Sequence, residues 1–278
     1  MIKIENIEYD GFIPAIRGMR NPMNSWEKSD SGWDTGWPRD HGILIDEDSD
    51  SYYECRIGPN DQELMRKLAK AGSVHAKYRR MITVYMDITA PLYWWKEFDT
   101  YKVGTVANSC STMHKIHAKE FTLEDFSHEH LFSFENTESH RHDAFTNSFG
   151  VIDDRVAFDK NGSHKHYECL YSYPLEALKY TIQLLNNARE YYIRDGNKEW
   201  WWQMIQLLPS SYNQKRTVML NYEVLSNIYA NRKDHKLDEW RIFCEEMKQK
   251  LPMPELFTGE LKEVQDAIQT DTDDDQQH

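Results

Sequence analysis

The chain has 278 residues, of which 40% are hydrophobic and 28% are charged, and its mean hydropathy is −0.79. These values are typical of a soluble globular protein, and no apolar run approaches the roughly 18 residues of a membrane-spanning helix. The formal net charge is −13, from 33 Lys and Arg against 46 Asp and Glu. An acidic chain is a poor general binder of nucleic acid, because that affinity comes largely from neutralising phosphates.

The cysteines indicate a reducing compartment. They are widely spaced and include no CxxC pair, and no signal-peptide pattern precedes the first acidic residues. We therefore expect a cytoplasmic protein that partners neither membranes nor nucleic acid. The four cysteines are Cys55, Cys110, Cys169 and Cys244.

The first hundred residues are expected to alternate strands with helices. Apolar residues alternate over 1–9, and the run MITVYMDI over 81–88 is mostly β-branched, aromatic or apolar, so both segments are predicted to be strands. Gly58-Pro59-Asn60 predicts a helix start with Asn60 as the N-cap. The other expected elements are a turn over 30–37, a short strand over 41–45 and helices over 61–71, 74–80 and 91–98.

The segment 15–28 allows two interpretations. It carries Arg17 and Arg20 beside Gly18 and Asn21, a combination that could hold a phosphate. A solvated loop is the favoured alternative, since surface connections commonly carry such residues.

Helical periodicity dominates the second half of the chain. Leu175, Leu178, Ile182 and Leu185 recur at helical spacing, which predicts a long amphipathic helix over 174–194. Residues 150–166 are typical of a hairpin or loop with Asn161-Gly162 at its turn. Further helices are expected over 198–207, 217–231, 234–251 and 258–268.

The stretch from Trp94 to Lys115 is the most informative about function. A helical, aromatic segment leads into a loop rich in Gly, Thr, Asn, Ser and Cys. Small polar residues leave backbone N–H groups accessible, so such a loop can turn many donors toward one anionic ligand. By itself the loop could equally be a polar connection between two helices.

Several positions in and before this loop follow a recognisable order. Thr89-Ala90-Pro91 ends a predicted strand, Glu97 lies on the next helix, and Thr100-Tyr101-Lys102 comes three residues later. Asn108 and Ser111 follow, with Met113 two residues further on. The order resembles the signature of the flavin-dependent thymidylate synthase (ThyX) family, in which a glutamine stands at Glu97 and an Arg-His-Arg triplet at 100–102. The match to Ser111 needs one inserted residue; without it Cys110 takes the serine position.

A second, separate stretch matches the same family in order and nearly in spacing. Asn221 and Asn227 are six residues apart, and one residue fewer separates Arg232 from His235 than in the family. Glu239 and Arg241, which complete this stretch, are expected to form a structural ion pair. The full set is Leu208-Pro209, Asn221, Asn227, Arg232, His235, Glu239 and Arg241.

The resemblance implies roles for individual residues. The cofactor FAD would be bound by Thr100, Tyr101, Lys102, Val103, Asn221, Asn227 and His235. A pyrimidine nucleotide would be bound by Glu97, Asn108, Ser109, Ser111 and Arg232. The residues expected nearest to the reaction are Ser111, Cys110 and Arg232. Cys110 could also be a nucleophile, although packing is the favoured role because the family needs no enzyme nucleophile.

The chain departs from the family at its cationic positions. The family's cationic or histidine residues are replaced by neutral ones at Thr100, Tyr101, Ile205 and Met113, and Lys102 lacks the planar fork of arginine. Lys96, Lys115, Arg17 and Arg20 are the candidates for compensating charge. A carboxylate at Glu97 would suit an exocyclic amine, as on cytosine, so the pyrimidine could be one other than uracil.

Six histidines fall between residues 114 and 142. Imidazole suits zinc or iron, but no carboxylate or cysteine completes a known ligand spacing, so surface or core histidines are favoured over a metal site. They are His114, His117, His128, His130, His140 and His142.

The implied architecture is an α+β subunit with an antiparallel sheet flanked by helices. The family forms homotetramers with its sites between subunits. We expect one domain over 1–268, with an insertion at about 114–170, and a disordered acidic tail over 269–278.

The implied activity is the reductive methylation of dUMP. FAD would be the cofactor, methylenetetrahydrofolate the carbon donor and NADPH the reductant. Two alternatives stay open. One is a diverged relative that acts on another pyrimidine nucleotide such as dCMP, or that hydroxymethylates. The other is a nucleotide-binding protein without catalysis.

Overall fold

The computed structural model describes residues 1–36, 43–45, 52–133, 157–158, 164–165 and 174–260. The chain divides into two compact units, each assembled from three stretches of sequence. The first unit comprises Met1–Ile7, Tyr85–Met219 and His235–Phe243, and the second comprises Glu8–Val84, Leu220–Asp234 and Cys244–His278. The expectation of a single domain over 1–268 stays a prediction.

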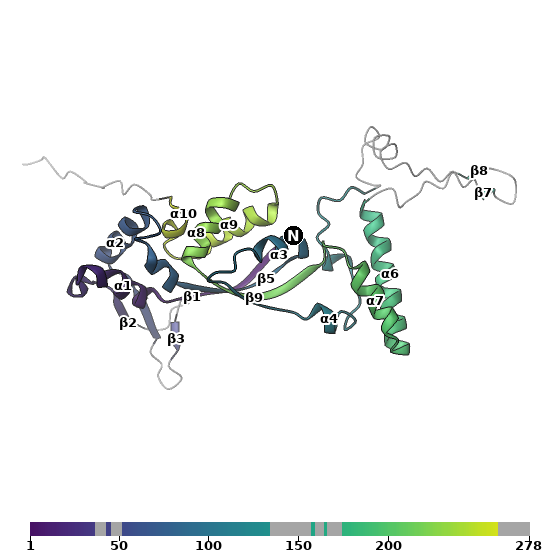
Figure 1. Ribbon diagram of the computed structural model, residues 1–278, viewed down its shortest axis with the longest axis horizontal. Helices are drawn as coiled ribbons and strands as arrows, with labels where there is room; N and C mark the ends of the chain where they lie inside the picture. The colour runs from purple at the N-terminus through teal and green to yellow at the C-terminus, as the bar shows by residue number, and fades with distance from the viewer. Residues whose placement is uncertain (37–42, 46–51, 134–156, 159–163, 166–173, 261–278) are drawn as a thin grey trace, which may run out of the picture. The chain divides into compact units, whose positions relative to one another are not determined.

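The main sheet has four strands in the order β1-β5-β9-β6 (Figure 1). The strands predicted over 1–9 and 81–88 are confirmed as β1 and β5. Strand β6 pairs antiparallel with β9, with Ser109 opposite Arg216. The strand bounds are Lys3–Asp10 for β1, Thr83–Pro91 for β5, Val106–Ser109 for β6 and Asn213–Asn221 for β9.

Strand β9 corrects one prediction. The helix expected over 217–231 begins only at Tyr222, as α8 (Tyr222–Arg232). Within β9 the buried Val218 and Leu220 alternate with more exposed neighbours, which is the two-residue period of a strand. The position of β9 between β5 and β6 in the sheet favoured the extended form over the local helical pattern. A second correction concerns β6, whose residues were predicted to form a loop and instead form a strand.

Two helices predicted from periodicity are confirmed in the first unit. Helix α6 (Pro174–Asp195) and helix α7 (Lys198–Leu207) lie side by side (Figure 1). Leu185 of α6 and Met204 of α7 are fully buried in one hydrophobic cluster with Phe121. The burial of these apolar faces, more than helix propensity, stabilises such a pair.

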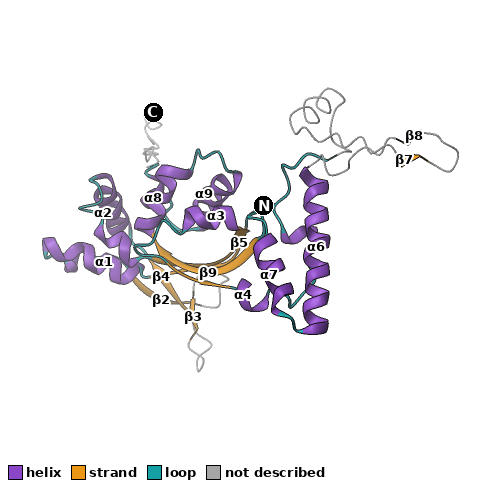
Figure 2. Cartoon of the chain, turned by 45° about the vertical axis from the view of Figure 1, so that its right-hand side comes forward, coloured by secondary structure: helices purple, strands orange, loops and turns teal. Residues whose placement is uncertain are grey.

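A second core brings the two matched stretches of sequence together. Helix α3 (Leu92–Phe98) and helix α9 (Asp238–Lys250) lie over the same face of the sheet (Figure 2). The fully buried rings of Trp94 on α3 and Trp240 on α9 have centroids 4.7 Å apart, and Phe98 stacks on Trp94 at 5.1 Å. Aromatic packing therefore fixes the first matched segment against the second.

The second unit contains a small antiparallel sheet in the order β2-β4-β3. Residues 30–37, expected as a turn, instead supply the strand β2, while the expected short strand over 41–45 is present as β3. The bounds are Gly32–Gly36 for β2, Ile43–Ile45 for β3 and Tyr52–Arg56 for β4.

Helices make up the rest of the second unit. Helix α2 is confirmed, but its N-cap is Gly58, and Asn60 lies in its first turn. The 3-10 helix η3 takes part of the helix expected over 74–80. Helix α10 ends at the first residue of the helix expected over 258–268, most of which lies outside the described residues. The bounds are Phe12–Arg20 for α1, Asn21–Met23 for η1, Trp26–Lys28 for η2, Pro59–Lys70 for α2, Lys77–Met81 for η3 and Glu255–Thr258 for α10.

The segment 15–28 is mostly helical rather than the favoured solvated loop, and phosphate binding there stays a prediction. Most of it belongs to α1, η1 and η2, and its Arg20 is buried. Nε of Arg20 donates to Oδ1 of Asp61 at 2.6 Å, and the same carboxylate accepts from Ser29 and Ser31 at 2.7 Å each. This network ties the segment after α1 to the start of α2.

Some predicted features lie wholly or partly outside the described residues. The strands β7 (Ala157–Phe158) and β8 (His164–Lys165) pair antiparallel, as a hairpin requires, but Asn161-Gly162 at the turn is not described. The same holds for Cys169, His140, His142 and the tail from residue 261. None of the helices in the described ranges is both long enough and apolar enough to cross a membrane.

Candidate functional site

Glu97 connects the two matched stretches. It lies on α3, and its Oε2 accepts a hydrogen bond from Nε1 of Trp240 at 3.0 Å. The same oxygen lies 3.7 Å from Nε2 of His235. Two residues assigned to the site on separate sequence motifs, Glu97 and His235, are thus brought to one place.

The orientation of His235 follows from its backbone neighbours. The amide of Leu237 donates to Nδ1 of His235 at 3.2 Å. Nδ1 is therefore an acceptor, and a neutral ring carries its proton on Nε2, the nitrogen that faces Glu97.

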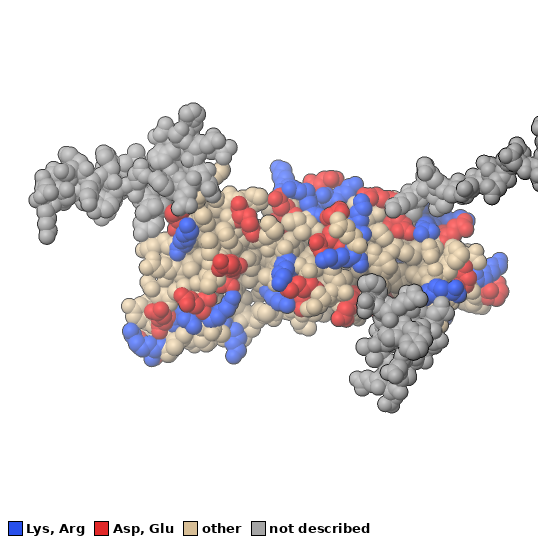
Figure 3. All heavy atoms as spheres, turned by 180° about the vertical axis from the view of Figure 1, so that it is seen from behind, with Lys and Arg blue, Asp and Glu red and all other residues tan. Residues whose placement is uncertain are grey.

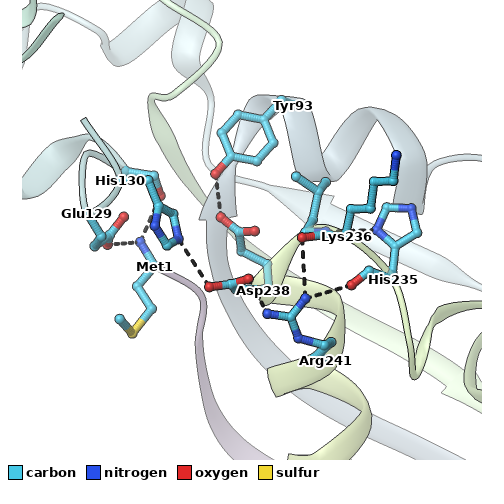
Figure 4. Close-up of polar contacts among 11 residues, drawn as sticks. Met1, Tyr93, Glu129, His130, His235, Lys236, Asp238 and Arg241 are labelled. Carbon is cyan, nitrogen blue, oxygen red and sulfur yellow. Dashed lines mark hydrogen bonds and ion pairs between the residues drawn. The ribbon is translucent and has the colours of Figure 1, made fainter. Parts of the chain in front are cut away.

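Arg241 braces the turn that carries His235 (Figure 4). Its Nη1 donates to the carbonyl oxygens of His235 at 2.8 Å and Lys236 at 3.3 Å, while Nη2 pairs with Asp238. The expected ion pair between Glu239 and Arg241 is absent from these described residues, because Glu239 instead accepts from the hydroxyl of Tyr93. Burial and the Glu239 hydrogen bond raise the pKa of that hydroxyl.

The residues at the triplet positions follow directly after α3. Thr100 is exposed, and its hydroxyl donates to the carbonyl oxygen of Glu97 at 2.7 Å. Tyr101 is half-buried, and its ring lies 6.0 Å from that of Trp240. Lys102 and Val103 are exposed. Tyr101 therefore joins Glu97 and Trp240, whereas Lys102 and Val103 present their side chains to solvent.

The segment from Asn108 to Ser111 forms an exposed edge. Asn108 and Ser109 end strand β6, all four residues of which are exposed. The amide of Cys110 donates to the carbonyl oxygen of Lys215 at 3.0 Å, so this segment continues along β9. Ser111 is the N-cap of the short helix α4 (Thr112–Lys115) and accepts from the amide of His114. The thiol of Cys110 is exposed, which does not match the favoured packing role.

Three assigned residues belong to the second unit. Asn221 is the N-cap of α8 and is buried; its Oδ1 accepts from the amide of Val224 at 3.0 Å. The helix expected over 217–231 would have placed both asparagines on neighbouring turns. In the structure Asn221 is instead the N-cap, and only Asn227 lies within α8. Asn227 is exposed on α8, and Arg232 is the last residue of that helix.

Sequence reasoning missed Arg216 on β9. Its guanidinium hydrogen-bonds Asp99 at 2.7 Å and lies 4.2 Å from the ring centroid of Trp95. Nothing in the sequence singled out this arginine, because Asp99 and Trp95 are more than a hundred residues away along the chain.

On the face shown in Figure 3, Lys and Arg are interspersed with Asp and Glu rather than gathered into one patch. A hollow of about 530 Å³ in the second unit is lined in part by Arg20, Lys28 and Glu63, and holds none of the residues assigned to the site. Among the described residues, no three His, Cys, Asp or Glu side chains are grouped so as to hold a metal ion.

Known structures share the fold of this chain. Thymidylate synthase X from Helicobacter pylori, crystallised with FAD and dUMP, aligns with a TM-score of 0.55 at 14% identity, covering 94% of this chain and 98% of that chain. The fold is that of the flavin-dependent thymidylate synthases. A UMP/dUMP methylase from Streptomyces cacaoi bound with 5-Br UMP shares it, with a TM-score of 0.52 at 11% identity and coverage of 93% and 95%.

Sequence comparison adds no closer relative. No protein-family model matches the chain, and no curated protein matches it in sequence. At this identity the likeness concerns the fold, which is mixed helix and antiparallel sheet as the sequence predicted.

Proposed function

We propose that the protein is an enzyme that methylates the pyrimidine ring of dUMP reductively. FAD is the cofactor, methylenetetrahydrofolate the carbon donor and NADPH the reductant. The active form is a homotetramer, as the sequence resemblance implies. The supporting observation is that Glu97 and Tyr101 from the first matched stretch cluster with His235 and Trp240 from the second, on a fold shared with two enzymes named for dUMP chemistry.

The exposed donors of the first unit fit a phosphate-bearing cofactor. Lys102 offers a cation, and Val103 lies in an exposed loop whose backbone a ligand can approach. The hydroxyl of Thr100 can donate to a ligand once it leaves the carbonyl oxygen of Glu97. His235 is partly exposed, so its ring can contact an isoalloxazine. The flavin, when bound, supplies the hydride chemistry; these residues bind and orient it.

In the second unit the proposed flavin residues are Asn221 and Asn227. The side-chain oxygen of Asn221 is committed to the α8 cap, so any contact with a ligand falls to its amide nitrogen. Asn227 is exposed and keeps its whole amide available, since only its backbone carbonyl accepts from Asn231.

The nucleotide is assigned to the β6 edge. Asn108, Ser109 and Ser111 offer amide and hydroxyl donors, and Arg232 of the second unit offers a cation for a pyrimidine carbonyl. Ser111 and Arg232 are the proposed residues nearest to the reacting ring. Cys110 precedes Ser111 in the chain, is exposed, and is the proposed alternative at the serine position.

The test begins with a visible absorption spectrum of the purified protein, repeated after incubation with FAD and desalting. We expect a flavin band that persists through desalting, followed by dUMP-dependent oxidation of the reduced flavin in the presence of methylenetetrahydrofolate. Formation of dTMP, detected by chromatography, completes the assignment. The absence of any flavin band after reconstitution would contradict the proposal.

Glu97 supports one alternative within the same chemistry. A carboxylate can accept from the exocyclic amine of cytosine, which uracil lacks. In the structure Glu97 accepts from Trp240 through Oε2. Parallel titrations with dUMP and dCMP decide between the two substrates, and tighter binding of dCMP would replace dUMP in the proposal.

A further inference from the structure

Arg216 places a partly buried cation next to a site that has lost its arginines. It lies on β9 directly opposite Ser109 of β6, and its side chain is only 15% exposed. The preceding residue along the strand shows that this position is particular. Lys215 points to the opposite face of the sheet, where it pairs with Asp87 at 3.1 Å, since successive side chains of a strand alternate.

Three contacts fix the guanidinium of Arg216. Nε donates to Oε1 of Gln214 at 2.9 Å, Nη1 donates to Oδ1 of Asp99 at 2.7 Å, and Cζ lies 4.2 Å from the ring centroid of Trp95. The indole of Trp95 is itself buried and donates to the carbonyl oxygen of Gln214 at 2.9 Å. Within the described residues Nη2 makes no hydrogen bond. The group is therefore held in place with donor capacity remaining, which lowers the entropy cost of binding a ligand.

The same contacts join both parts of the first matched stretch. Asp99 immediately precedes the altered triplet position Thr100. Gln214, which orients Arg216, also donates through Nε2 to the carbonyl oxygen of Cys110 at 3.2 Å and to Oγ1 of Thr112 at 2.8 Å. One guanidinium is thus anchored to the end of α3 and to the segment after β6.

We propose that Arg216 binds a phosphate group of a nucleotide ligand, supplying the charge that is missing at Thr100 and Met113. This inference rests on the proposed function, and it names a residue that the sequence resemblance did not. Two ligands carry the required chemistry, the monophosphate of dUMP and the diphosphate of FAD. Planar guanidinium groups pair bidentately with phosphate oxygens, so both are suitable partners.

Asp99 is the competing anion. Its side chain is 52% exposed, so it can turn into solvent when a phosphate takes its place on Nη1. Removing this carboxylate should therefore strengthen phosphate binding. If the pair with Arg216 were only structural, Asp99→Asn would leave phosphate affinity unchanged.

The test uses three variants of the full chain. Arg216→Gln removes the charge, Arg216→Lys keeps it without the planar fork, and Lys215→Gln removes the same charge from the opposite face of the same strand. Calorimetric titrations with dUMP, deoxyuridine and FAD are compared with the wild type, and circular dichroism checks the fold. A parallel arm follows the broadening of the ³¹P resonance of inorganic phosphate.

We expect Arg216→Gln to weaken binding of the phosphate-bearing ligand by about 10- to 100-fold, with Arg216→Lys intermediate and Lys215→Gln unchanged. Deoxyuridine, which lacks the phosphate, should bind all forms alike. Loss confined to dUMP assigns Arg216 to the substrate, and loss confined to FAD assigns it to the cofactor. Affinities for both ligands that survive in Arg216→Gln would overturn the inference and leave the proposed function standing.

The phosphate arm separates the two failures. The protein could bind neither dUMP nor FAD and still broaden the phosphate resonance in the wild type but not in Arg216→Gln. That result would contradict the proposed function and keep Arg216 as a phosphate site. The absence of binding to any phosphate-bearing probe would overturn both.

Discussion

The carboxylate of Glu97 lies 3.7 Å from Nε2 of His235 and accepts the indole hydrogen of Trp240. The related signature has a glutamine at this position, whose amide oxygen could accept from the indole equally well. Only a carboxylate also places a negative charge facing the imidazole of His235. The substitution therefore adds charge to an otherwise conventional hydrogen bond.

Glu97→Gln should be well tolerated. The amide keeps an acceptor for Trp240. The side chains of His235 and Glu97 are 25% and 35% exposed, so losing the contact between them costs less than about 1 kcal/mol. Glu97→Ala removes the acceptor as well and should cost about 1–3 kcal/mol. Urea unfolding of both variants measures the difference, and equal losses would show that the charge, not the hydrogen bond, matters.

Truncation should be costly at a tryptophan of the aromatic core and tolerated at an exposed tryptophan. Trp94 is fully buried against Trp240, Phe98 and Phe243, so Trp94→Ala is expected to cost about 3–5 kcal/mol. Trp202 on α7 is 42% exposed and serves as the matched control, with an expected cost below about 1 kcal/mol. Denaturation midpoints that move equally would contradict the assigned core.

Removal of one partner of the buried pair Arg20–Asp61 should be strongly destabilising. Both side chains are at most 4% exposed, so Asp61→Asn leaves a buried cation without its counter-charge, at a cost of about 3–5 kcal/mol. Asp195→Asn breaks the exposed pair with Arg194 and should change stability by at most about 1 kcal/mol. Thermal unfolding of the two variants side by side tests the contrast.

Acid should weaken the fold through Asp87. Hydrogen bonds from Thr217, Asn6 and Lys215 lower the pKa of this carboxyl from 3.8 to about 2. Because its folded pKa lies below its unfolded value, its contribution is complete above the unfolded pKa and is lost as the pH falls from about 4 to 2. The stability difference between wild type and Asp87→Asn should therefore shrink over this range. A difference that stays constant with pH would rule out Asp87 as the cause.

The described cysteines should react in a fixed order. The thiol of Cys110 is exposed, whereas burial raises the pKa of Cys244 to about 12 despite the nearby Arg232. Iodoacetamide at pH 8 should modify Cys110 first and reach Cys244 only after unfolding, because the thiolate is the reactive form. Peptide mass spectrometry of wild type and Cys110→Ser reads the order. Early alkylation of Cys244 in the native protein would contradict it.

A local sequence pattern was sufficient to predict an element where that single segment carried the whole pattern. The helix over 174–194 was predictable because its apolar residues recur at helical spacing. The strand over 81–88 was predictable because it is a short run of mostly β-branched, aromatic or apolar residues. The order of Glu97, Tyr101, Asn221 and His235 was also readable, since order along the chain needs no structure. The grouping of Glu97, Tyr101 and His235 with Trp240 was not, apart from what the resemblance implied.

The sequence by itself determined the helices with strong apolar faces, the α+β class and the residues that resemble a nucleotide-modifying site. Only the tertiary structure decided that Thr217–Leu220 is strand, that Arg20 is buried against Asp61, and that Arg216 lies opposite Ser109. The physical reason is the same in each case. Strand pairing and buried ion pairs join groups that are distant in sequence, and their free energy exists only once the fold has brought the partners together.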